Sequence, residues 1–233
     1  MSRVLTTVSV GALFAFAAPD ALDAQVCAGQ AAFGRYALQV AATSEFNGDA
    51  RAFGGSMAVG GRRPFAGLAV SRTTFDGIDG SSITLGGGFG YQVPLDPNNQ
   101  AQLCPVASVA FAIGPNNVDL SGGAGTFIAD LRETDLQFGV SAGVIAAHSD
   151  IHRRRFIPTA SFTVVRGTAT LKNDLNGTSS SESKTWELVS MGAGVVFNQS
   201  VTLLAGTTIP MGLDGASTTY HVSLSLNVSK YAP

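Results

Sequence analysis

Within the segment 218–230, residues 220–229 alternate strictly between apolar and polar side chains. A period of two residues predicts a β-strand with one apolar and one polar face. A strand of this kind needs neighbours to pair with, so we expect the rest of the chain to supply strands and the first of them to pair with this one. The apolar row is Tyr220, Val222, Leu224, Leu226 and Val228, and the polar row is His221, Ser223, Ser225, Asn227 and Ser229.

Similar alternating runs fill the chain upstream, separated by segments rich in Gly, Asn, Asp and Pro. They predict about ten antiparallel strands, with eight or twelve as the alternatives. Short connections alternate with long ones along the chain, and an even strand number places both chain ends on one side of the sheet, with the shorter turns. The expected strands are 33–43, 53–61, 65–74, 82–93, 106–114, 135–147, 156–170, 185–197, 201–209 and 218–230.

The composition of the polar faces favours a membrane protein. They carry Gly, Ala, Ser, Thr, Gln and Asn in place of Lys, Glu and Asp, and only 13% of all residues are charged, against about 25% in soluble domains. We therefore predict an all-β, closed antiparallel up-and-down transmembrane β-barrel, with a secreted or periplasmic soluble β-sandwich binding module as the alternative. Aromatic residues expected to form interfacial girdles are Phe33, Phe53, Phe65, Tyr91, Phe156, Trp186, Phe197 and Tyr220.

The N-terminus has the features of a secretory signal peptide. A short basic segment, 1–3, precedes the apolar run 4–18, which is too short to span a bilayer. We expect residues 1–24 to be the signal peptide and residues 25–233 to be a single barrel domain. The formal net charge of −2, without a basic helix, gives no indication of a nucleic-acid partner.

The chain has two cysteines, Cys27 and Cys104. In an oxidising compartment they form a possible disulfide, and the reduced pair is the alternative. No suitable ligands surround them in the sequence, so we predict no metal site and no cofactor.

Acidic residues concentrate on the side of the predicted long loops and arginines on the side of the predicted short turns. Acidic loops would bind divalent cations shared with lipopolysaccharide or favour cations at a pore mouth, while simple solvation is the alternative. The acidic set is Glu45, Asp49, Asp76, Asp79, Asp119, Asp130, Glu133, Asp135, Asp174, Glu182 and Asp214, and the basic set is Arg62, Arg63, Arg153, Arg154 and Arg155.

The signal peptide, the alternating hairpins, the loop asymmetry and the amphipathic last strand together resemble the small bacterial outer-membrane β-barrel proteins, the class of the outer-membrane protein A transmembrane domain. The resemblance implies a bacterial outer-membrane location, with outer-membrane lipids, lipopolysaccharide and the barrel assembly machinery as partners. Its implied role is structural, surface-interacting or that of a narrow pore, without catalysis. One departure is that Tyr231 lies on the parity of Asn227, whereas the family usually ends on an outward-facing aromatic residue.

One pair of residues suggests an enzymatic alternative. His221 and Ser223 share the polar face of the last strand, a spacing that resembles the His-x-Ser of barrel-embedded lipid A deacylases. A histidine beside a hydroxyl would act as its general base. No orienting acid is evident, so a lipid-modifying hydrolase using His221 and Ser223 remains an alternative to a non-catalytic barrel.

Overall fold

We describe the protein from a computed structural model, which covers residues 26–28, 37–60, 63–77, 80–98, 100–115, 118–119, 128–149, 154–173, 178–197, 201–213 and 215–228. The predicted signal peptide and Tyr231 lie outside these described residues. Within the described ranges, no helix is long and apolar enough to cross a membrane.

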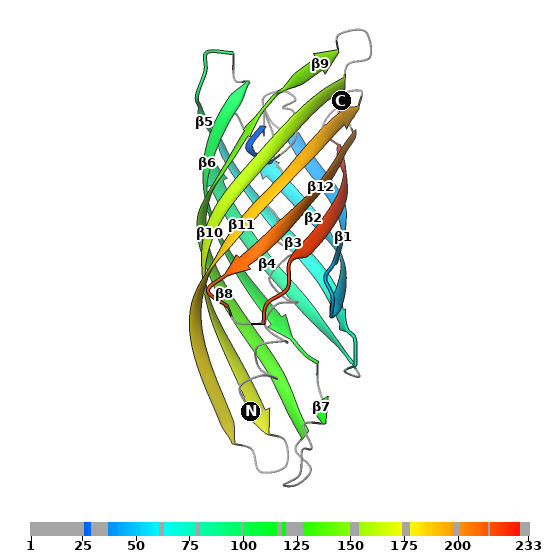
Figure 1. The fold of residues 1–233 in the computed structure, drawn as a ribbon, viewed down its shortest axis with the longest axis vertical. Helices are drawn as coiled ribbons and strands as arrows, with labels where there is room; N and C mark the ends of the chain where they lie inside the picture. The colour runs from blue at the N-terminus through cyan, green and yellow to red at the C-terminus, as the bar shows by residue number, and fades with distance from the viewer. Residues whose placement is uncertain are drawn as a thin grey trace.

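Ten long antiparallel strands form a barrel (Figure 1). Short strands β5 (Val93–Pro94), β7 (Val118–Asp119) and β9 (Ala147–Ser149) extend β6, β8 and β10 at its ends. The predicted count of about ten is confirmed. The long strands are β1 (Ala37–Phe46), β2 (Ala50–Gly60), β3 (Pro64–Phe75), β4 (Ser81–Tyr91), β6 (Ala101–Ile113), β8 (Ile128–Val144), β10 (Arg154–Asn173), β11 (Ser179–Phe197), β12 (Val201–Met211) and β13 (Thr219–Asn227).

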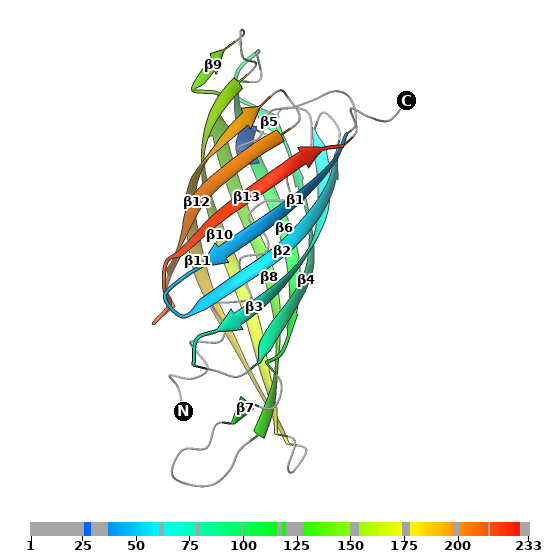
Figure 2. The same ribbon diagram turned by 90° about the vertical axis from the view of Figure 1, so that its right-hand side faces the viewer.

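The barrel closes through its last strand. Figure 2 shows β13 lying between β1 and β12, and the β1–β13 register runs from Gln39 opposite Asn227 to Phe46 opposite Tyr220. The predicted pairing of the last strand with the first is therefore confirmed. We call the end at which β1 begins and β13 ends the terminal end, and the opposite end the distal end. Closure satisfies the backbone groups that an open sheet would leave unpaired at its edges.

The apolar rows face outward on every long strand. In β13, Leu224 is 49% exposed while Ser225 is 2% exposed. The alternation therefore separates an apolar exterior from a polar interior, and the soluble β-sandwich alternative is wrong because its apolar face would be buried between two sheets. Exposed apolar side chains that mark the outer face of the ten strands are Phe46, Phe53, Leu68, Leu85, Phe111, Phe138, Phe162, Met191, Leu203 and Leu224.

Several strands extend further toward the distal end than predicted. β8 begins at Ile128, β10 ends at Asn173 and β11 begins at Ser179, so parts of the expected long loops are strands. The β10–β11 hairpin and the start of β8, which pairs with β10, project together beyond the other long strands (Figure 1). The hydroxyl groups of the hairpin pair across its strands, Thr168 with Ser183 at 2.8 Å and Thr170 with Ser181 at 2.9 Å. These residues are polar. The backbones of the two strands therefore stay paired beyond the point where the apolar–polar alternation, from which the strands were predicted, ends.

The predicted aromatic girdle is partly wrong. Phe65 and Trp186 are only 4% and 3% exposed, because both lie on the inward parity of their strands. Phe53, Tyr91, Phe156 and Tyr220 are exposed on the outer face, as predicted. Phe46, which is not among the predicted girdle residues, stacks on Tyr220 with ring centroids 5.7 Å apart. Phe33 lies outside the described residues.

Candidate functional site

The candidate functional site is the barrel lumen, whose middle section is lined by small residues. A barrel of about eight strands is just wide enough to be filled by its own side chains. Ten strands enclose more space, and many of the inward residues near mid-strand are small. Inward positions near mid-strand include Ala41, Thr43, Gly54, Ser56, Gly88, Ser108, Gly139, Ser161 and Ser190.

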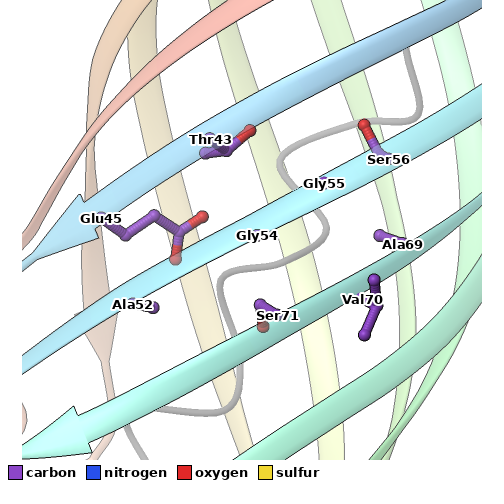
Figure 3. Close-up of a pocket in the computed structure, with 9 residues that line it drawn as sticks. All are labelled: Thr43, Glu45, Ala52, Gly54, Gly55, Ser56, Ala69, Val70 and Ser71. Carbon is purple, nitrogen blue, oxygen red and sulfur yellow. The ribbon is translucent and has the colours of Figure 1, made fainter.

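A small pocket with a volume of about 10 Å³ lies along β1, β2 and β3. Figure 3 shows the Glu45 side chain extending over β2 beside Gly54. A cavity of this volume is about the size needed for one water molecule, far below the roughly 300–1,000 Å³ typical of sites for small organic ligands. It therefore suits water and small ions better than a large solute. Its lining residues are Thr43, Glu45, Ala52, Gly54, Gly55, Ser56, Ala69, Val70 and Ser71.

Three carboxyl groups line the lumen toward the distal end. Glu45, Glu133 and Asp135 are 5%, 5% and 1% exposed. The sequence places Glu45 and Glu133 in long loops and Asp135 at the start of a predicted strand, and the two loop placements are wrong because β1 continues to Phe46 and β8 begins at Ile128. The alternation of side chains along the strand would have located Glu133 and Asp135, because positions 133 and 135 continue the inward row that includes Gln137.

The register partners of Asp135 offer it no polar side chain. Asp135 Oδ1 has no hydrogen-bond partner in the described part of the chain. The nearby arginines point away, because Arg132 and Arg166 are exposed on the outer parity of β8 and β10. The residues opposite Asp135 on the two neighbouring strands are small: they are Ala110 of β6 and Gly167 of β10. The distal half of the lumen is therefore negatively charged wherever the three carboxyl groups ionise.

His221 and Ser223 both face the lumen, 7% and 5% exposed. Within the described residues, no hydrogen bond joins them, and Ser223 Oγ instead accepts one from Thr43 Oγ1 at 3.1 Å. The imidazole lies against β12, where a Cβ added to Gly206 would be 2.6 Å from Nε2. Glu45 is the register partner of His221 on β1. The two residues thus share a face, as predicted, but the nucleophile–base hydrogen bond is not formed.

At the terminal end, the short 3-10 helix η2 (Val26–Ala28) occupies the lumen. Val26 and Cys27 are 0% and 2% exposed. A disulfide joins Cys27 to Cys104 of β6, and Ser141 of β8 donates a hydrogen bond to the Cys27 carbonyl oxygen. Sequence reasoning considered this cysteine pair, but it did not place a segment inside the barrel.

Taken together, the closed antiparallel sheet, the exposed apolar outer face and the polar lumen define a transmembrane β-barrel. No protein-family model and no curated protein matches the chain.

Similar solved structures include three bacterial barrels. The N-terminal β-barrel domain of Pseudomonas aeruginosa OprF is 12% identical with a TM-score of 0.35, covering 84% of this chain and 99% of that one. The translocator domain of the Neisseria meningitidis autotransporter NalP is 13% identical with a TM-score of 0.44, covering 97% and 93%. The β domain of the Bordetella autotransporter BrkA is 13% identical with a TM-score of 0.45, covering 83% and 99%. Since these TM-scores are below 0.5, we base the transmembrane assignment on the two faces of this barrel.

Proposed function

We propose that the protein is an integral outer-membrane barrel that forms a narrow, cation-preferring pore and carries out no catalysis. The barrel lies in a bacterial outer membrane, where closed barrels of this kind occur. The observation that carries the proposal is the placement of Glu45, Glu133 and Asp135 inside the lumen. Its partners are the outer-membrane lipids and lipopolysaccharide around the apolar band and the assembly machinery that inserts the barrel.

The lumen supports this proposal by its width and its charge. We expect the small residues at mid-barrel to leave room for water and small ions. Rings of carboxylates in a pore attract cations and repel anions, and the effect is strongest where the walls have a low dielectric constant. Because Arg132 and Arg166 face outward, neither neutralises the carboxyl groups from inside the barrel.

Ion selectivity in planar bilayers tests the proposal. We expect discrete conductance steps and, across a KCl gradient, a reversal potential that indicates preference for K⁺ over Cl⁻. The combined substitution Glu133→Gln and Asp135→Asn is expected to shift the reversal potential toward zero. Glu182→Gln is the matched control, because Glu182 is exposed on the projecting hairpin.

Two results would contradict the proposal. Absence of discrete steps would favour a structural or surface-interaction role for the barrel. Conductance with an unchanged reversal potential in the lumen variant would show that these carboxyl groups do not set the ion preference.

A further inference from the structure

The segment η2 is enclosed by side chains from most of the barrel wall. On one side, Val26 packs with Ile157 of β10 and Val196 of β11, which are 0% and 1% exposed. On the other side, Cys27 and Cys104 pack with Ala58 of β2 and Phe65 of β3. The contacts therefore reach both sides of the lumen at the terminal end.

The wall is also shaped to receive the backbone of η2. Gly143 of β8 lies so close to η2 that an added Cβ would overlap the Val26 carbonyl oxygen and lie 2.6 Å from the carbonyl carbon. The Ser141 hydroxyl, two residues earlier on the same inward row, donates to the Cys27 carbonyl oxygen. A buried carbonyl group needs such a donor, so this wall combines a missing side chain with a hydrogen-bond partner for the segment.

We propose that Val26–Ala28 is a plug that closes the terminal end of the lumen and that the Cys27–Cys104 disulfide holds it there. The bond ties the plug to β6, while Val26 reaches across to β10 and β11. Three residues make too small an apolar surface to remain seated without a covalent tie. Breaking the tie therefore lets the plug leave and opens this end of the barrel. We call the contact site of Val26–Ala28 in the lumen the seat of the plug. The expected effect on conductance rests on the proposed pore, whereas the presence of the plug in its seat does not.

Serine variants of the two cysteines test this inference. We expect wild-type protein, with the disulfide formed, to conduct weakly, and Cys27→Ser and Cys104→Ser each to raise the conductance severalfold. Heat-modifiable gel mobility of each variant shows that the barrel has folded. Two variants with the same expected result keep the test valid if one of them folds poorly.

A second readout is labelling of the folded Cys27→Ser protein with a polar maleimide. Cys104 is then the only thiol in the chain, and it is 0% exposed while the plug is seated. We expect labelling close to the rate seen in unfolded protein, because the seat empties.

The outcomes separate the plug from the pore. If wild type and both variants conduct equally, the plug is wrong and the pore stands. If no form conducts, the pore proposal fails, and labelling alone decides the plug: rapid labelling of Cys104 supports it and protection of Cys104 overturns it.

Discussion

Replacing Gly143 with alanine tests the seat of the plug without removing either cysteine. The added Cβ would overlap the Val26 carbonyl oxygen and lie 3.2 Å from the Cα of Cys27. These are backbone atoms, so no change of rotamer relieves the overlap. Either strand β8 or the plug must move.

The energies indicate that the plug moves. β8 is paired along its length with β6 on one side and β10 on the other. Burial of Val26 contributes about 1.5–3 kcal/mol and the Ser141 hydrogen bond about 0.5–1.5 kcal/mol. Ordering the backbone costs about 1–2 kcal/mol per residue, so these terms nearly cancel over the three residues of η2. Once the disulfide is open, overpacking of about 1–3 kcal/mol is therefore enough to displace it.

The disulfide equilibrium measures this displacement. In mixtures of reduced and oxidised glutathione, we expect Gly143→Ala to lower the equilibrium constant for forming the Cys27–Cys104 bond by roughly 5- to 150-fold. The bond requires the seated geometry, so destabilising the seat weakens the bond by the same factor. Free thiols are counted by the mass increase after alkylation.

Gly55→Ala is the matched control. It is also a glycine in a long strand, but its added Cβ would meet only the Ala41 carbonyl oxygen at 3.5 Å, an ordinary van der Waals distance. The disulfide equilibrium of this control should equal that of wild type. An unchanged equilibrium in Gly143→Ala together with a lower melting temperature of the barrel would refute the reasoning, because the wall would have yielded and the plug would have stayed.

Two further predictions concern the last strand. Leu224→Arg should destabilise folding into lipid vesicles by about 2–4 kcal/mol, because the side chain faces lipid near mid-strand. Urea titration measures this free energy, and the control Leu224→Phe should destabilise the barrel much less. Equal destabilisation by both substitutions would argue against lipid contact. His221→Ala and Ser223→Ala should leave the lipid A profile of cells unchanged, since no hydrogen bond links these two described residues; mass spectrometry of lipid A checks this, and a loss of deacylated species in both variants would support the hydrolase alternative.

The strands and their order follow from the sequence. Alternation of apolar and polar residues gave the number of long strands, the pairing of the last strand with the first and the position of most turns. Errors arose where that alternation weakens. The distal parts of β10 and β11 carry hydroxyl groups on paired residues, such as Thr168 and Ser183, so nothing in the local pattern separates them from a polar loop.

The lumen carboxyl groups show the same limit at single residues. Glu133 is charged, and charged side chains usually mark loops, so the predicted loop extended to Glu133 and the predicted strand began only at Asp135. The burial of both residues follows from the pairing of β8 with β6 and β10, which extends the inward parity of Gln137 toward the distal end. Local composition cannot reveal a pairing partner that lies far away in the chain.

The alternating segment 218–230 by itself determined a strand with two unlike faces, and composition favoured lipid on the apolar side. Only the tertiary structure decided that Leu224 faces outward and His221 inward, because alternation has the same period whichever face is buried. The position of the plug depends even more on the tertiary structure. Cys27 meets Cys104, Ser141 and Gly143 through contacts between residues far apart in the chain. Such contacts exist only after the sheet has closed and created the lumen that η2 enters.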